Sequence, residues 1–170
     1  VEVMGGVDRP GQYIAEALRQ GKYVVTANKD LMAQKGIELL RLAGEHKKNI
    51  YYEASVGGGM PVIRPLKDSL AANRVKRIMG IINGTTNYIL TQMTRFNKEF
   101  DVALREAKEK GFAEQDPSSD LEGRDAAYKL VILAANAFQS VVKMEDIYVE
   151  GIDGLDLRDI LYASELGYVI

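Results

Sequence analysis

The chain has 170 residues, of which 46% are hydrophobic and 27% are charged. This composition is that of one globular domain, or of two lobes sharing a core, and it excludes a disordered chain. The 22 basic and 24 acidic residues give a formal net charge of −2, so no basic excess is available for binding a nucleic acid backbone. The chain has no cysteine, which excludes disulfides, thiolate nucleophiles and cysteine-based metal sites.

No apolar segment has the length of a membrane span, since the uncharged run 131–142 contains Asn136 and Gln139. The first residues do not have the form of a signal peptide. The absence of cysteine fits a reducing compartment, and we expect a cytoplasmic protein. Both ends interrupt apolar segments, so we expect the sequence to be a fragment of a longer one. The single histidine, His46, lies in a charged stretch, which is typical of a solvated surface residue.

Strand and helix patterns alternate over residues 1–55, which favours a parallel sheet. Apolar strands are expected at 1–4, 23–25 and 50–52. Asp8 with Pro10 marks the start of the first helix and Gly21 its end, and a second helix follows residues 26–29. These elements form half of a doubly wound sheet. The glycine-rich stretch 56–60 does not have the Gly-x-Gly-x-x-Gly spacing of a dinucleotide-binding loop.

The pattern changes at Pro61, which indicates a boundary between two lobes. Beyond it we expect strands at 75–82 and 146–149, and helices at 62–72, 88–93, 100–110, 122–138 and 158–167. Thr85, Thr86 or Asn87 is expected to cap the helix at 88–93. The second lobe is therefore predicted to be α+β.

The densest group of polar residues lies at 114–129. Asp125 and Lys129 are four residues apart, so they share one face of the predicted helix, close to its apolar stripe. One interpretation is an acidic first turn with an ordinary salt bridge. The other is a pocket in which carboxylates hold a cationic group while the lysine handles a proton. Gly123 is unfavourable in a first helical turn, which suggests that another backbone or a ligand comes close.

Three other segments allow both a structural and a functional interpretation. Residues 26–29 follow a parallel strand, where α/β proteins bind ligands, although Asn28 also suits a helix cap. The loop 53–60 can direct carbonyl oxygens at a hard cation, or it can be a plain turn. Residues 83–87 can bind a substrate carboxylate at a helix N-terminus, or form a capped turn.

Four blocks of the sequence together resemble homoserine dehydrogenase, in the order in which that family has them. They are GKYVVTANK at 21–29, EASVGGGMP at 53–61, GIINGTTNYIL at 80–90 and GFAEQDPSSDLEGRDAAYK at 111–129. The resemblance runs from Val1 to Ile170. It implies interconversion of L-aspartate 4-semialdehyde and L-homoserine with NADP or NAD, in threonine, methionine and isoleucine biosynthesis. It implies an α/β fold, with the C-terminal half of a Rossmann-like nucleotide-binding domain at 1–55. An α+β catalytic and dimerisation domain with a mixed sheet would follow at 56–170, in a homodimer.

The resemblance also implies roles for individual residues. Lys129 matches the proton donor to the substrate carbonyl, and Lys29 matches a lysine where cofactor and substrate meet. The residues expected to bind the substrate are Glu114, Asp120 and Asp125. Asn28, Lys29 and Gly111 are expected to bind the cofactor. The backbone carbonyls expected to hold a monovalent cation, sodium in this family, are those of Glu53, Val56, Gly58 and Met60.

Two other functions remain open from the residues. The chain can belong to another semialdehyde or amino-acid oxidoreductase, which activity with different aldehydes would distinguish. It can also be, as it stands, only a dimerising scaffold. Because the glycine-rich nucleotide-binding loop is missing, we expect the isolated 170 residues to have little or no turnover.

Overall fold

The computed structural model describes residues 1–170. It divides into two compact units. The first unit comprises Val1–Met79 and Ala127–Tyr148, and the second comprises Gly80–Ala126 and Val149–Ile170. None of the helices has the length and apolar character needed to cross a membrane.

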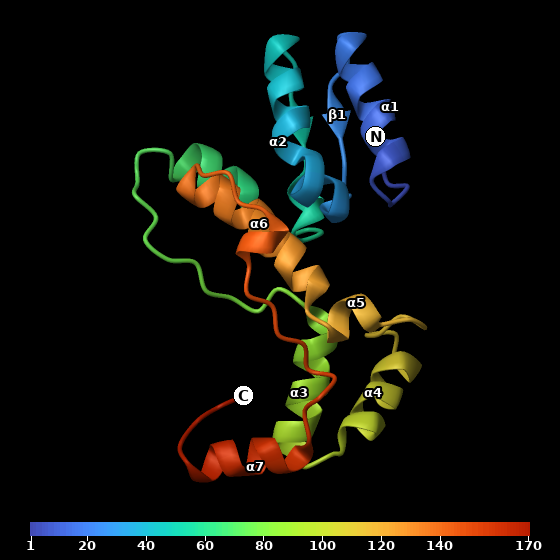
Figure 1. Cartoon of the computed structure of the whole chain (residues 1–170), viewed down its shortest axis with the longest axis vertical. Helices are drawn as coiled ribbons and strands as arrows, with labels where there is room; N and C mark the ends of the chain where they lie inside the picture. The colour runs from blue at the N-terminus through green and yellow to red at the C-terminus, as the bar shows by residue number, and fades with distance from the viewer. The chain divides into compact units, whose positions relative to one another are not determined.

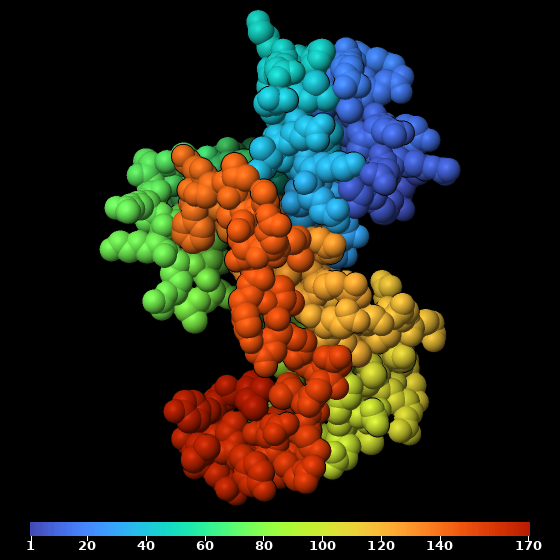
Figure 2. Space-filling model, viewed as in Figure 1, coloured from blue at the N-terminus to red at the C-terminus, as the bar shows by residue number.

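The first unit contains a small parallel sheet. Strand β1 (Val24–Val25) pairs in parallel with β2 (Ile50–Tyr51), and Glu2 forms a parallel bridge to Thr26. The predicted parallel pairing of the first three strand segments is therefore present, with the first segment reduced to a single bridge. The helices α1 (Asp8–Arg19) and α2 (Lys29–Glu45) pack against each other beside the sheet, and Figure 2 shows their atoms, blue and cyan, in direct contact.

The ends of α1 and α2 follow from their local sequence. Asp8 is not the cap that was predicted but the first helical residue, and its carboxylate pairs with Lys35 of α2 at 2.9 Å. Gly21 ends α1 as predicted, with the amide of the following residue donating to Ala17 O at 2.9 Å. His46 forms the C-cap of α2 and is exposed, as expected.

The remaining helical elements of the first unit are short, apart from α6 (Arg124–Phe138). They are the 3₁₀ turns η1 (Glu53–Ser55) and η3 (Met144–Asp146) and the π-helical turn η2 (Pro65–Ser69). The predicted helix at 62–72 is therefore much shorter than expected. The buried apolar side chains of the unit form one core, which includes Leu18, Leu31, Val24, Ile50, Ile132 and Leu133.

The second unit is helical (Figure 1). Helix α3 (Gly84–Phe96) packs against α4 (Phe100–Glu109), α5 (Ser118–Leu121) and α7 (Leu157–Glu165). Their buried residues, Ile89, Met93, Ala103, Ala107, Ala113, Leu121 and Ile160, form a second core. Helix α3 begins at Gly84 rather than Tyr88 because Asn83 caps it: its Oδ1 accepts a hydrogen bond from the Thr86 amide at 2.9 Å.

The predicted strands of the second lobe are absent, and so is its mixed sheet. Residues 73–83 have no regular structure, and the segment predicted as the strand 146–149 begins in η3 and continues irregularly. No strand occurs after Tyr51. An apolar alternating segment becomes a strand only where a neighbouring strand accepts and donates its backbone hydrogen bonds. No strand of this chain pairs with residues 75–82, and Met79 and Ile81 remain about four-fifths exposed, at 81% and 78%.

Candidate functional site

The most organised polar cluster of the second unit connects the start of α3 to α5 and α6. The side-chain nitrogen of Asn83 donates to Asp120 Oδ1 at 2.7 Å and to Asp125 Oδ2 at 3.0 Å. Asn83 and Asp125 are only 8% and 6% exposed. One amide group thus fixes the positions of two carboxylates, from α5 and from the first turn of α6.

Thr85 holds Asp120 from the other side. Its hydroxyl oxygen lies 2.7 Å from Asp120 Oδ2 and 2.7 Å from the carbonyl oxygen of Phe112, so its single proton can serve one of them at a time. Each oxygen of Asp120 therefore has its own neighbour, Asn83 on one side and Thr85 on the other. This arrangement restricts rotation of the carboxylate.

The turn between α5 and α6 is fixed by a close backbone approach. A Cβ atom on Gly123, which has a φ of +79°, would lie 3.1 Å from Glu150 O, and one on Gly151 would lie 2.6 Å from Leu121 O. The Ile152 amide donates to Leu121 O at 2.7 Å. The prediction that another backbone comes close to Gly123 is confirmed. Gly123 also ends α5, which is why α6 begins at Arg124 rather than at Glu122.

Two further predicted residues lie in the second unit outside this cluster. Glu114 is exposed in the loop that follows α4. Gly111 has a φ of +76° and ends α4, with the amide of the next residue, Phe112, donating to Ala107 O at 2.8 Å. A helix end of this kind needs a residue with left-handed backbone angles, which glycine adopts most readily. Gly111 therefore has a structural reason for being glycine.

Asn28 and Lys29 lie in the first unit, where β1 leads into α2. The Asn28 side chain caps α2 through the Leu31 amide at 3.0 Å and donates to Gly6 O at 2.7 Å. It thereby joins the two loops that follow neighbouring parallel segments. Lys29 is the first residue of α2 and is partly buried. At this edge of the sheet, open α/β proteins bind their ligands.

Two buried residues behind Asn28, Glu2 and Thr26, were not predicted from the sequence. Glu2 is 6% exposed, and one of its carboxylate oxygens accepts a hydrogen bond from the Thr26 hydroxyl at 2.6 Å. The same hydroxyl accepts a hydrogen bond from the Asn28 amide at 3.0 Å. These contacts fix the backbone just before Lys29. An apolar strand with one glutamate carried no signal for them.

The loop 53–60 is fixed by the Glu53 side chain. Its Oε1 accepts hydrogen bonds from the Val62 and Ile63 amides, the latter at 2.6 Å, and its Oε2 accepts from the Arg64 amide at 2.9 Å. Burial alone would raise the pKa of Glu53, but the three amide hydrogen bonds and the nearby Arg64 charge outweigh burial and lower this pKa.

Four backbone carbonyl oxygens of this loop were predicted to be the ligands of a monovalent cation. Those of Val56, Gly58 and Met60 accept no backbone hydrogen bond, while Glu53 O accepts from the amides of Val56 and Gly57 at 3.2 and 3.3 Å. Carbonyl oxygens are suitable ligands for a hard cation. No group of three or more His, Asp or Glu side chains is arranged as a metal site.

The structure brings together Asp120 and Asp125, through Asn83. Lys29 and Lys129 belong to the first unit, where Lys129 is partly buried on α6. Residues 83–87 had been singled out in the sequence as a capped turn or an anion site. The turn is capped, but sequence reasoning missed that Asn83 and Thr85 also hold carboxylates, because their partners follow more than 30 positions later.

Comparison with known families gives two matches that together cover most of the chain. The homoserine dehydrogenase NAD-binding domain matches residues 1–53, and the homoserine dehydrogenase domain matches residues 61–170. The homoserine dehydrogenase of Bacillus subtilis is 49% identical over 170 residues, which is 100% of this chain and 39% of the relative. The chain therefore spans about two-fifths of that relative's length.

Solved structures agree with these matches. A homoserine dehydrogenase from Thiobacillus denitrificans superposes with a TM-score of 0.94 at 45% identity, over 99% of this chain and 39% of that one. A hyperthermophilic archaeal homoserine dehydrogenase mutant in complex with NADPH gives a TM-score of 0.82 at 34% identity, over 93% of this chain and 49% of that one. From its two family matches and these relatives, the chain belongs to the homoserine dehydrogenase family, whose members are NAD(P)-dependent oxidoreductases.

Proposed function

We propose that these 170 residues form the central catalytic portion of an enzyme that interconverts L-aspartate 4-semialdehyde and L-homoserine. The observation that carries the proposal is the Asp120–Asn83–Asp125 cluster, which presents two oriented carboxylates in a chain of this family. An amino-acid substrate carries an ammonium group, and a carboxylate pair is a suitable partner for it. Asp120 and Asp125 bind this group, with Glu114 completing the site from the loop after α4.

The reaction also needs a proton on the substrate oxygen. Hydride addition to an aldehyde develops negative charge on that oxygen, and an ammonium side chain stabilises the charge and donates the proton. Lys129 has this role in the proposal, and Lys29 lies where substrate and cofactor meet. Both residues are partly buried, which strengthens electrostatic interactions relative to bulk water.

NADP or NAD supplies the hydride when bound. The first unit is suitable for holding it, because the Gly5–Gly6 loop and Asn28–Lys29 follow adjacent parallel segments and are joined by the Asn28–Gly6 hydrogen bond. Asn28, Lys29 and Gly111 are the residues assigned to it. A monovalent cation, sodium in our proposal, fits the carbonyl oxygens of Glu53, Val56, Gly58 and Met60. We further propose a nucleotide-binding domain at 1–55, a catalytic and dimerisation domain at 56–170, and a cytoplasmic homodimer.

The test is an assay of the full natural polypeptide that contains these residues. L-homoserine should reduce NADP⁺ or NAD⁺, followed by the absorbance of the reduced nicotinamide, and L-aspartate 4-semialdehyde should support the reverse reaction. A panel of other semialdehydes distinguishes this enzyme from a related oxidoreductase. The isolated 170 residues should show little or no turnover. Activity with another aldehyde but none with these two substrates would overturn the proposal.

A further inference from the structure

Asn83 makes more interactions than a helix cap requires. Its Oδ1 accepts hydrogen bonds from the Thr86 amide at 2.9 Å and the Thr86 hydroxyl at 3.0 Å, which is the capping function. Serine and aspartate cap helices about as well, since the cap needs only a side-chain acceptor. The NH₂ group of Asn83 plays no part in the cap. Both of its protons are used on carboxylates instead.

The two carboxylates that Asn83 contacts need a donor between them. Asp120 and Asp125 carry like charges and approach the same nitrogen, at 2.7 and 3.0 Å, so their mutual repulsion favours turning apart. An amide NH₂ group has two donors in a fixed plane and is uncharged. It can therefore hold both carboxylates and leave their negative charge in place. A lysine or arginine in the same position would neutralise that charge.

We propose that Asn83 is a positioning residue for an ammonium-bearing substrate, holding the Asp120 and Asp125 carboxylates in a fixed mutual orientation. Thr85 supports the arrangement, since its hydroxyl lies 2.7 Å from the Asp120 oxygen that Asn83 does not contact. The identity of the substrate rests on the proposed function, whereas the role of Asn83 rests on these contacts. Asn83 acts through the two carboxylates and is not assigned a contact with the substrate.

The decisive variant is Asn83→Ser, because serine keeps the cap acceptor but has no NH₂ group to bridge two carboxylates. Asn83→Ala removes both functions. Asp156→Ser is the matched control, because Asp156 caps α7 of the same unit through the Arg158 amide at 2.8 Å and lies outside the cluster. All three are made in the full natural polypeptide. KM and kcat for L-homoserine oxidation and the thermal unfolding midpoint are measured for each.

We expect Asn83→Ser to raise KM for L-homoserine about tenfold or more, as expected for losing hydrogen bonds to charged groups that orient a binding site. Its kcat should change much less, and its unfolding midpoint should fall less than that of Asn83→Ala, because serine keeps the cap acceptor. Asn83→Ala should raise KM as much and also lower the midpoint. Asp156→Ser should leave KM unchanged. If Asn83 is only a cap, Asn83→Ser will have the wild-type KM and only Asn83→Ala will be impaired, which overturns the inference.

A second measurement does not depend on activity. The side-chain amide signal of Asn83 in a ¹⁵N correlation spectrum is assigned by its disappearance in Asn83→Ser. We expect Asp120→Ala and Asp125→Ala each to shift this signal and to speed exchange of one of its two protons with water. A signal unaffected by either change would contradict the inference even if the enzyme acted on homoserine. Shifts in a protein inactive towards homoserine would support the positioning role while refuting the proposed function.

Discussion

Glu53 uses its side chain and its backbone for different purposes. The carboxylate accepts hydrogen bonds from three successive amides at 62–64, where the chain enters η2. The backbone carbonyl belongs to the set proposed for a cation. Removing the carboxylate therefore disturbs the geometry of the loop 53–60 without removing any proposed cation ligand.

We predict that Glu53→Gln lowers the free energy of unfolding by about 1–2 kcal/mol at neutral pH, because an amide has one acceptor oxygen and no charge. The pKa of Glu53 is lowered in the folded protein. Its contribution to stability is thus present above the ordinary carboxyl pKa and is lost as the pH falls through the lowered value. Urea unfolding at neutral and acidic pH should show the difference between wild type and variant shrinking in acid. A difference independent of pH would contradict the charge as the cause.

Lys129 is the proton donor that we propose for the reaction. Replacing it with alanine in the full natural polypeptide should lower kcat by about 10²- to 10⁴-fold, while KM changes less, because a proton donor acts mainly in the transition state. Alanine favours helix, so α6 should persist. Steady-state kinetics and circular dichroism measure the two effects. Near-normal kcat in a folded variant would exclude Lys129 as the proton donor and leave Lys29 as the next residue to replace.

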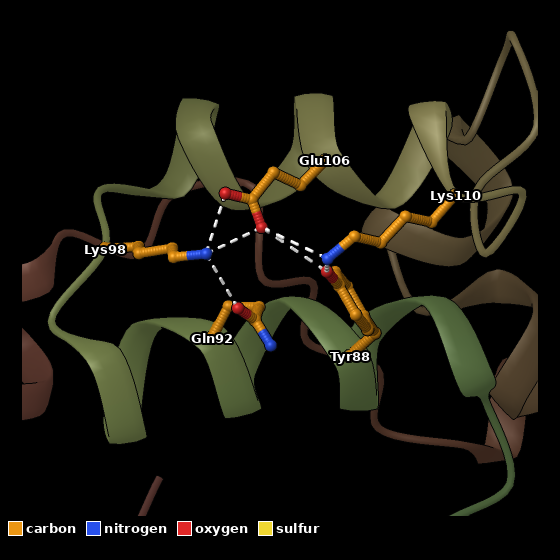
Figure 3. A network of polar contacts seen from close by, with 5 residues as sticks. All are labelled: Tyr88, Gln92, Lys98, Glu106 and Lys110. Carbon is orange, nitrogen blue, oxygen red and sulfur yellow. Dashed lines mark hydrogen bonds and ion pairs between the residues drawn. The ribbon is translucent and has the colours of Figure 1, made fainter.

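At the scale of elements, α3 and α4 are joined by a network of polar contacts, which runs from Lys98 in the loop between the helices to Lys110 at the end of α4 (Figure 3). Lys98 donates to both oxygens of Glu106 at 2.7 Å and to Gln92 at 2.9 Å. On the other side of Glu106, Lys110 donates to the Tyr88 hydroxyl at 2.9 Å. The hydrogen bond from Lys98 lowers the pKa of Glu106. This network holds α4 against α3, and Asn83 caps the N-terminus of α3.

We predict that Lys98→Met lowers the thermal midpoint by several degrees at neutral pH, because Glu106 then loses its principal partner while the apolar part of the side chain is kept. The matched control is Lys143→Met, which removes an exposed pair with Glu145 at 3.0 Å and should change the midpoint by about a degree or less. The effect of Lys98→Met should diminish in acid, as the pH falls through the lowered pKa of Glu106. Equal effects of the two variants would show that the network contributes nothing beyond a surface ion pair.

The helices and strands were predicted well where the residues that determine them lie close together in the sequence. The end of α1 at Gly21 and the parallel pairing of the first strands were predicted because glycine caps and apolar strand–helix alternation are local patterns. Helix α3 begins four residues before the predicted start, because the cap is Asn83 rather than one of the three residues 85–87 that were expected to cap it. The predicted strand at 75–82 is absent because a strand forms only beside another strand. The alternation of apolar and polar residues in the segment does not indicate whether a neighbouring strand exists.

The sequence singled out Asp120 and Asp125 as candidate site residues, but it did not predict how their carboxylates are held. Asp125 was a candidate because it shares a helical face with Lys129, and Asp120 was a candidate through the resemblance to homoserine dehydrogenase. The role of Asn83 depends on contacts 37 and 42 positions away, which no local pattern encodes. The same limit applies to Gly123, for which the sequence indicated a close neighbour but not that the neighbour is Glu150.

At the scale of the whole molecule, the segment 75–82 belongs to no strand and exposes the apolar side chains of Met79 and Ile81 in one copy of the chain. Contact with the same segment of a second copy would bury Met79 and Ile81, so we predict a homodimer of the full natural polypeptide. Ile81→Lys should weaken dimerisation at least tenfold, because a charge would then have to be buried at the interface. Tyr13→Lys, at an exposed position on α1, is the control and should leave it unchanged. Sedimentation equilibrium at micromolar concentration measures both, and a wild-type protein that stays monomeric there would contradict the prediction.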